Sequence, residues 1–361
     1  MKRLFAGTAA GLLAVVLLFP IKAQAISARR AYAMDAISGK VLYERSPQER
    51  SLIASTTKIM TALIVCEQCN VLDRMRVPKE AVGIEGSSMY LKEGEILTLQ
   101  ELLYGLMLSS GNDAAVALAI YCGGTVEGFA GLMNDKAHRL GMTGTHFENP
   151  NGLDSPGHYS TARDLAVLAA YAMENPVFRQ TVSTKSIRIG DRYLTNHNKL
   201  LWRISGAEGV KTGFTKAAGR ILVSSAQREG RRVVAVTIDD PNDWSDHQKL
   251  LENGFSRYET RRVINKGETV GTMEVAGGQR QKVTVLASED LDFSLAPDEQ
   301  VQLALSGSGF LYAPAVEGAA GPDCYALLGG KALAKVPTIF GETIEQTPME
   351  EKSFWEKIFK R

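Results

Sequence analysis

Residues 55–64 read STTKIMTALI, and this stretch decides the fold prediction. Its apolar residues recur at the spacing of one helix face, so a helix begins at the tetrad of residues 55–58. Residues three apart share a helix face, which brings Ser55 Oγ and Lys58 Nζ within hydrogen-bond reach. A serine hydroxyl is a poor nucleophile until a base takes its proton, and a lysine is such a base when burial or nearby positive charge lowers its pKa. Read alone, Ser-x-x-Lys is more often an ordinary solvated helix start.

The second motif is Ser110-Gly111-Asn112, which lies between helices predicted at 99–108 and 113–121. Loops between helices present their side chains, so Ser110 can pass a proton to a leaving amine and the Asn112 amide can hold a peptide group. The alternative is an ordinary turn, because Ser, Gly, Asn and a following Asp also make a helix cap.

The third motif is KTGFT at residues 211–215, on a predicted strand. One cation and two hydroxyls on a strand suit a substrate carboxylate. Gly213 lets the backbone approach a ligand closely, and the Phe214 N–H can complete an oxyanion hole with the N–H of Ser55. The alternative is a strand end that carries an exposed lysine.

The order of the three motifs is the signature of penicillin-binding proteins and class A β-lactamases. From about residue 26 to 340 the chain resembles the low-molecular-mass penicillin-binding proteins, the serine D-alanyl-D-alanine carboxypeptidases. Three further segments look like family segments: 149–153 (NPNGL), 160–164 (STARD) and 196–201 (NHNKLL). The resemblance implies an α/β (α+β) fold, in which a transpeptidase-like domain of antiparallel sheet, flanking helices and a helical subdomain precedes a small all-β domain.

The resemblance also implies a reaction. Ser55 is acylated by the penultimate D-alanine of a peptidoglycan stem pentapeptide, the terminal D-alanine leaves, and water releases the tetrapeptide. Lys58 would be the acylation base, while Ser110 and Lys211 would relay protons. β-Lactams would acylate Ser55 as substrate mimics, and no cofactor is expected.

For substrate binding, the resemblance implies that Asn112 positions the peptide and that Thr212 with Thr215 receives the carboxylate. Members often carry His or Arg near that carboxylate. Here Phe214 follows the Lys-Thr-Gly motif, and His197 occupies the middle of the Asn-x-Asn segment.

Two arginines, Arg203 and Arg220, are candidate carboxylate partners that the sequence does not place. The preference for the terminal residue of the substrate therefore stays open.

The chain divides into four predicted parts: a signal peptide at 1–25, the catalytic domain at 26–255, a β-rich domain at 256–342 and an amphipathic tail at 343–361. A hairpin is predicted at 32–43, and after Asn175-Pro176 the pattern predicts strands up to a closing helix that ends near 255. Beyond the helices at 99–108 and 113–121, further helices are predicted at 126–140 and 161–173, the last beginning at Thr161 with Asp164 three residues later.

Both ends of the chain bear on localisation. Lys2-Arg3, an uncharged stretch and Ala23-Gln24-Ala25 predict export with cleavage after Ala25, and an uncleaved membrane anchor is the alternative. Residues 349–361 gather Phe354, Trp355, Ile358 and Phe359 on one helix side, so they form a candidate interfacial membrane anchor. The alternatives are a frayed tail and a helix docked on the β-domain. The protein is expected at the outer face of the cell membrane.

The sequence gives little support for nucleic-acid binding, metal binding or cysteine chemistry. The net charge is +1 and the sequence has no run of Lys and Arg that could contact a phosphate backbone, which argues against nucleic-acid binding. The five histidines show no metal-ligand spacing, so no metal is expected. Cys66-x-x-Cys69 has no second close pair, and Cys66 continues an apolar stripe; the cysteines are therefore predicted to be buried free thiols.

The sequence leaves three alternative functions to consider. A β-lactamase on this fold needs a second base to hydrolyse the acyl-enzyme. Class A enzymes have a glutamate with an asparagine four residues later, whereas here Gly152 lies four residues after Glu148. A D,D-endopeptidase shares the acylation half-reaction. A non-catalytic wall-binding module is the third, and the intact triple motif argues against it.

Overall fold

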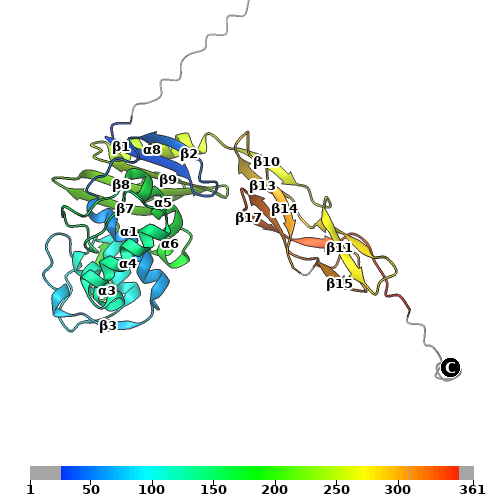
Figure 1. Cartoon of the computed structure of the whole chain (residues 1–361), viewed down its shortest axis with the longest axis horizontal. Helices are drawn as coiled ribbons and strands as arrows, with labels where there is room; N and C mark the ends of the chain where they lie inside the picture. Colours follow the sequence, from blue (N-terminus) through cyan, green and yellow to red (C-terminus); the bar gives the residue numbers. More distant parts are fainter. Residues whose placement is uncertain (1–25, 308, 349–361) are drawn as a thin grey trace, which may run out of the picture.

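The computed structural model describes residues 26–307 and 309–348. The predicted signal peptide and the amphipathic segment 349–361 lie outside the described residues. Figure 1 shows two bodies, a sheet with helices around it and an elongated β-structure that follows in the chain. The α+β fold class predicted from the sequence is confirmed.

A five-stranded antiparallel sheet organises the first body, in the order β2-β1-β9-β8-β7. Its strands are β1 (Arg30–Asp35), β2 (Val41–Arg45), β7 (Ala207–Thr215), β8 (Gly219–Arg228) and β9 (Arg231–Ile238). All eight residues of β9 are buried. Val233 and Ala235 join one apolar cluster, and Val234 and Val236 join another, so both faces of the sheet are covered.

Two helices cover the faces of this sheet. Helix α8 (Asp243–Phe255) packs on one side and α5 (Ala162–Ala172) on the other. Thr161 caps α5 as predicted, because its Oγ1 accepts a hydrogen bond of 3.0 Å from the N–H of Asp164.

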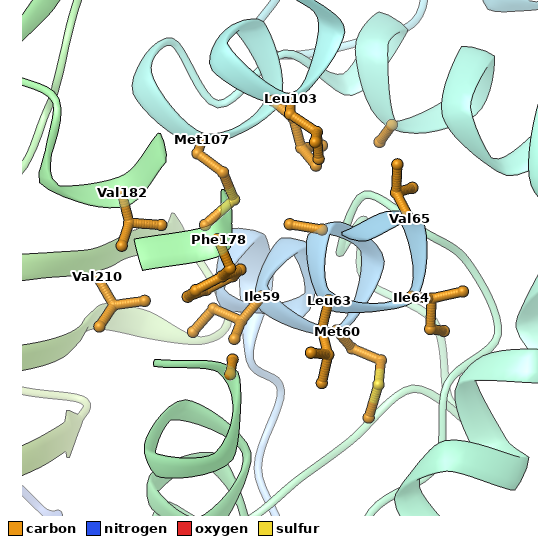
Figure 2. Close-up of a cluster of buried hydrophobic side chains, with 14 of the residues drawn as sticks. Ile59, Met60, Leu63, Ile64, Val65, Leu103, Met107, Phe178, Val182 and Val210 are labelled. Carbon is orange, nitrogen blue, oxygen red and sulfur yellow. The ribbon is translucent and has the colours of Figure 1, made fainter. Parts of the chain in front are cut away.

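The remaining helices form a subdomain around α1 (Lys58–Gln68), which follows a short 3₁₀ turn, η1 (Ala54–Thr57). Figure 2 shows α1 side chains such as Ile59 and Leu63 among apolar side chains of other helices and of β7. This burial fixes the tetrad at the N-terminus of α1. The other elements of the subdomain are η2 (Lys79–Ala81), α2 (Leu99–Leu108), α3 (Asn112–Gly123), α4 (Val126–Arg139), α6 (Pro176–Ser183), and the hairpins β3 (Arg74–Arg76) with β4 (Ile96–Thr98) and β5 (Ser186–Ile189) with β6 (Arg192–Thr195). Helix α7 (Leu200–Arg203) lies outside it, because Leu200 joins the apolar cluster on the α8 side of the sheet.

Helix α6 was not predicted, because the pattern after Asn175-Pro176 indicated only strands, the first of them at 186–189, where β5 lies. The Asn175 Oδ1 accepts hydrogen bonds from the N–H groups of Val177 and Phe178 at 3.0 and 3.1 Å. An Asn cap followed by proline at the first helical position is a helix-start signal. The apolar side chains of α6 then pack against α2 and β7.

The prediction that the cysteines are free thiols is wrong for two of the four. Cys69 and Cys122 form a disulfide that joins the end of α1 to the end of α3. Their separation of 53 residues hides the pairing from a search for close spacings. Cys66 and Cys324 are free, and burial raises the pKa of the Cys66 thiol to about 12.

Replacing both Cys69 and Cys122 by serine is expected to lower the free energy of unfolding by about 2–4 kcal/mol, since the closed loop restricts the unfolded chain. Urea denaturation followed by circular dichroism measures this loss. Cys66→Ser, which leaves the disulfide intact, is the control. A double variant as stable as wild type under oxidising conditions contradicts the structural role of the bond.

The second body is all β within the described residues. Its sheets are β10 (Glu259–Ile264) with β13 (Leu291–Leu295); β15 (Phe310–Tyr312), β11 (Thr269–Ala276), β12 (Lys282–Ala287) and β18 (Thr338–Phe340); and β14 (Gln302–Leu305), β16 (Cys324–Leu328) and β17 (Lys331–Val336). The all-β character agrees with the sequence prediction. The division drawn at 255/256 falls between α8 and β10 and stays a proposal.

Arg231 lies at the junction between the two bodies and contacts residues of both. Its side chain is fully buried and lies 3.4 Å from an Asp35 carboxylate oxygen, and its Nη2 also pairs with Glu299. Its Nε donates to the Ser294 carbonyl at 2.6 Å, and its guanidinium lies 4.5 Å from the centroid of the Tyr258 ring. Residues from both bodies thus neutralise and surround one buried charge.

Across residues 26–307 and 309–348, no single helix has the length and apolar composition needed to cross a membrane. One sharply bent pair, α3 with α4, meets the criteria together, with an angle of 82° between its helices.

Candidate active site

Ser55 lies in the η1 turn, directly before α1. The preceding Ala54 has φ +46°, a left-handed conformation that is costly for a residue with a side chain. This turn places Ser55 at the wall of a cleft of about 420 Å³. The Lys58 Nζ donates to Ser55 Oγ at 3.0 Å, as the three-residue spacing on the helix start predicts.

Lys58 is the buried base candidate. Its Nζ also donates to Asn112 Oδ1 at 2.7 Å and to the Asn151 carbonyl at 2.6 Å. Burial, followed by the nearby charge of Lys211, holds the pKa of Lys58 well below its ordinary value of 10.5, while Asp113 opposes this. The amine is therefore prepared to take the Ser55 proton.

A loop at residues 149–153 closes over the nucleophile turn. Gly152 has φ +85°, and a Cβ there would lie 1.9 Å from the Ala54 carbonyl oxygen. The Asn149 side chain holds the loop by accepting from the Gly152 N–H at 2.7 Å. Only glycine permits this approach, which brings the Asn151 carbonyl onto Lys58.

Ser110 and Asn112 come from the junction of α2 and α3. Ser110 is buried at φ +59° and lines the cleft. The Asn112 backbone N–H donates to the Ser87 carbonyl at 2.7 Å, and its Nδ2 donates to the Glu85 carbonyl at 2.5 Å. The Asn112 amide oxygen is thereby aimed at Lys58.

Strand β7 forms the opposite wall. Because it is the edge strand of the sheet, it offers backbone groups to an extended peptide. Lys211 is buried, its Nζ donates to the Thr212 carbonyl at 2.9 Å, and burial lowers its pKa to about 7. A Cβ on Gly213 would lie 3.2 Å from the Ile53 carbonyl oxygen, so glycine keeps β7 close to the nucleophile turn.

The structure brings most of the predicted residues together. Ser55, Ser110, Thr212, Gly213 and Phe214 line the cleft. Lys58 is hydrogen-bonded to Ser55, and Asn112 is hydrogen-bonded to Lys58.

Thr215 is placed differently from the other predicted residues. Its Oγ1 donates to Asp154 Oδ1 at 3.2 Å and accepts from the Ala218 N–H at 3.0 Å. It is not among the residues that line the cleft, so its predicted contact with a carboxylate stays a prediction.

The cleft has further lining residues that sequence reasoning did not assign to it. Ser87, Lys199, Ile221, Asp243 and Trp244 line it, as do His197 and Arg220, which were noted without a position. They come from several distant segments, so no local motif announces them. The Asn151 carbonyl was missed because a backbone acceptor carries no residue-type signal.

His158 belongs to the support of this site. Its Nδ1 accepts from the Glu148 N–H at 3.1 Å, so its Nε2 donates to Thr57 Oγ1 at 2.7 Å. Burial lowers the pKa of His158 to about 4, which keeps the ring neutral. Within the described residues, no three His, Cys, Asp or Glu side chains gather as a metal site.

The pH dependence of acylation follows from Lys58. The neutral amine is the active form, so the rate is expected to rise with pH and to level off well below pH 10.5. Lys211→Gln removes a charge that lowers the pKa of Lys58, so its rise is expected at higher pH. Stopped-flow acylation by a chromogenic cephalosporin measures both curves. An unshifted curve in Lys211→Gln contradicts the electrostatic coupling.

Fold and site together define a serine acyl-transfer enzyme of the β-lactamase and transpeptidase type, with a buried lysine hydrogen-bonded to the serine. The profile of the D-alanyl-D-alanine carboxypeptidase family (Peptidase_S11) matches residues 19–242, and that of the penicillin-binding protein 5 C-terminal domain matches 258–346. The chain belongs to the D-alanyl-D-alanine carboxypeptidase family.

Individual relatives agree with this assignment. The D-alanyl-D-alanine carboxypeptidase DacC of Escherichia coli is 34% identical over 90% of this chain and 86% of its own length. DacF of Bacillus subtilis is 34% identical over 73% and 71%, respectively. Penicillin-binding protein 5 of Haemophilus influenzae superposes with a TM-score of 0.64 at 28% identity, covering 89% of this chain and 98% of that one. The Streptomyces K15 DD-transpeptidase gives 0.62 at 36% identity over 64% and 98%.

Proposed function

We propose that this enzyme removes the terminal D-alanine from peptidoglycan stem pentapeptides through an acyl-enzyme on Ser55. Family membership supports the D-alanyl-D-alanine carboxypeptidase activity. The observation that carries the assignment of residues is the 3.0 Å hydrogen bond between Ser55 Oγ and the buried Lys58 Nζ.

In the acylation step, Ser55 Oγ attacks the penultimate D-alanine carbonyl while its proton passes to Lys58 Nζ. The N–H groups of Ser55 and Phe214 stabilise the oxyanion. The carbon–nitrogen bond then breaks, and Ser110 passes a proton to the departing amine. Lys211 in turn passes a proton to Ser110. Asn112 positions the peptide and Thr212 contacts the carboxylate.

In the second step, water attacks the Ser55 ester and releases the tetrapeptide. A penicilloyl ester blocks this water path and is expected to persist. The Glu148 carboxylate, which a β-lactamase would need as a deacylating base, accepts instead from Ser155 Oγ and from the Gly157 N–H at 3.2 Å. This arrangement supports a carboxypeptidase over a β-lactamase.

The setting of the reaction is part of the proposal. A signal sequence at 1–25 would export the protein to the outer face of the cell membrane, where stem peptides occur. The amphipathic segment 349–361 would hold it at the lipid surface.

Incubation of the purified enzyme with benzylpenicillin tests this function. Mass spectrometry should show one long-lived penicilloyl adduct on the peptide that contains Ser55, and a pentapeptide should lose D-alanine. Rapid turnover of benzylpenicillin would reassign the protein as a β-lactamase. Dominant cleavage of a cross-linked dimer would make it an endopeptidase, and no adduct with no D-alanine release would leave a non-catalytic module.

A further inference from the structure

Ser27, near the beginning of the described residues, lies between two carboxylates. Its Oγ is 2.7 Å from Asp240 Oδ1 and 2.7 Å from Asp246 Oδ2, and its backbone N–H donates to the same Asp246 oxygen. Both aspartates are 1% exposed, and neither lines the cleft that contains Ser55. They form a buried acidic site that the reaction proposed above does not use.

This acidic site lacks one positive charge. A hydroxyl has a single proton to donate, so Ser27 can satisfy only one of the two carboxylates. Lys249 Nζ pairs with Asp246 Oδ1 at 3.1 Å, which balances one negative charge. Within residues 26–307 and 309–348, the buried Oδ2 of Asp240 accepts no hydrogen bond. Burial raises the pKa of Asp240, and the neighbouring charge of Asp246 adds to this rise.

We propose that the α-ammonium group of Ile26, formed when residues 1–25 are removed, supplies this charge and pairs with Asp240 and Asp246. The inference rests on the cleavage after Ala25 that is part of the proposed function. Ile26 directly precedes Ser27, and successive backbone nitrogens are about 3 Å apart, so the new amine forms within reach of both carboxylates. In the uncleaved chain the same nitrogen is a neutral amide.

Ile26 is held in place independently of its amine. Its side chain is 4% exposed and joins the apolar cluster that contains Leu250 and Leu251 of α8. Arg45, the cation next to Ile26, donates through Nη1 to the Ile26 and Ala28 carbonyls at 2.6 and 3.0 Å. Because packing already orders this residue, the ion pair adds little further loss of conformational entropy.

The acidic site is connected to the cleft through the chain between its two carboxylates. The Asp240 N–H donates to the Arg220 carbonyl at 3.0 Å. Asp243 and Trp244, which follow Asp240 and precede Asp246, line the cleft. Removal of the signal peptide should therefore stabilise the part of the cleft wall that this segment forms.

A proton is the other way to supply the missing charge. A protonated Asp240 would be a neutral acid that donates to Ser27 Oγ, and the Ile26 amine would then stay free. The two arrangements differ in the state of the amine, so the experiment measures that group directly.

The test compares the exported protein, whose first residue N-terminal sequencing should show to be Ile26, with a chain that begins at Ala23. The longer chain is released from an N-terminal fusion by a protease, and its amine lies three residues before Ile26. The melting temperature of the catalytic body, measured by calorimetry, should be about 3 to 6 °C lower in the longer chain.

Variants locate this difference. In Asp240→Asn/Asp246→Asn, the two chain lengths should melt within about 1 °C of each other, because the amine has lost its partners. Glu252→Gln, at an exposed position of α8, is the control and should keep the full difference.

Carbamylation by cyanate reports on the amine itself, because cyanate reacts with a neutral and accessible amine. An ion pair that raises the amine pKa by one unit slows this reaction about tenfold. The Ile26 amine of the exported protein should therefore react at least about tenfold more slowly than the Ala23 amine or the Ile26 amine of Asp240→Asn/Asp246→Asn. Mass spectrometry of the N-terminal peptide follows the reaction.

Several outcomes would refute the ion pair. They are an exported protein that begins at another residue, equal melting temperatures for the two chain lengths, and an Ile26 amine that reacts as fast as the Ala23 amine. The last result would show that a proton on Asp240 fills the site. The longer chain carries no substitution, so this comparison stands even if the double variant does not fold. D-alanine release is assayed on the same samples; its absence from all of them refutes the proposed function, while carbamylation still decides the ion pair.

Discussion

Ser55→Ala is expected to reduce D-alanine release by about 10⁴-fold or more and to abolish the penicilloyl adduct. The substitution removes the only atom of this residue that can form the ester. Ser55 Oγ has one neighbouring base, Lys58, whose other partners Asn112 and Asn151 remain in place. The fold should therefore persist, because a small hydroxyl at the cleft wall is replaced by a methyl group.

D-alanine release and adduct formation are measured together for this variant. Ser205→Ala, at an exposed position in the turn before β7, is the control and should match wild type. An adduct that survives in Ser55→Ala would locate the nucleophile elsewhere and would overturn the assignment of the tetrad.

Lys58→Met is expected to slow acylation by about 10³-fold, within the range attributed to a general base. Methionine fills a buried position without bringing an unpaired charge, although Asn112 and the Asn151 carbonyl lose a donor. The lost donor should also weaken the loop at 149–153. Burst kinetics with benzylpenicillin separate the acylation rate from binding.

Lys136→Met is the matched control for Lys58→Met. Lys136 is also a buried lysine, but its Nζ pairs with Glu67 at 2.7 Å and lies near the ring of Tyr171. Its loss should lower stability without slowing acylation in the folded protein. Equal effects of the two substitutions on acylation would show that burial of a lysine, and not its contact with Ser55, is what matters.

The sequence predicts best where periodicity and chemistry agree. The helix after Ser55 was predicted because its apolar positions repeat at the helical spacing, and α5 because Thr161 and Asp164 make a helix start. The hairpin of β1 and β2 followed from the turn between two short strands. In each case the determining residues lie within one turn or one hairpin.

The features that the sequence did not reveal depend on residues far apart in the chain. The disulfide joins Cys69 to Cys122 across four intervening elements, and Arg220 is placed only by its register opposite Phe214. Helix α6 is different, because its start signal at Asn175 was local and was interpreted as the boundary between the preceding helices and the following strands.

The buried Arg231 has a consequence for how this protein can be divided or recombined. The arginine belongs to the catalytic body, but Glu299 and the Ser294 carbonyl, two of its partners, belong to the β-structure. A catalytic fragment cut at the junction would keep the charge and lose these partners, at a cost that a neutral apolar side chain would avoid. A chimera that imports a β-domain from a relative must therefore import an acceptor for this guanidinium, so the junction behaves as part of both domains and not as a linker between interchangeable modules.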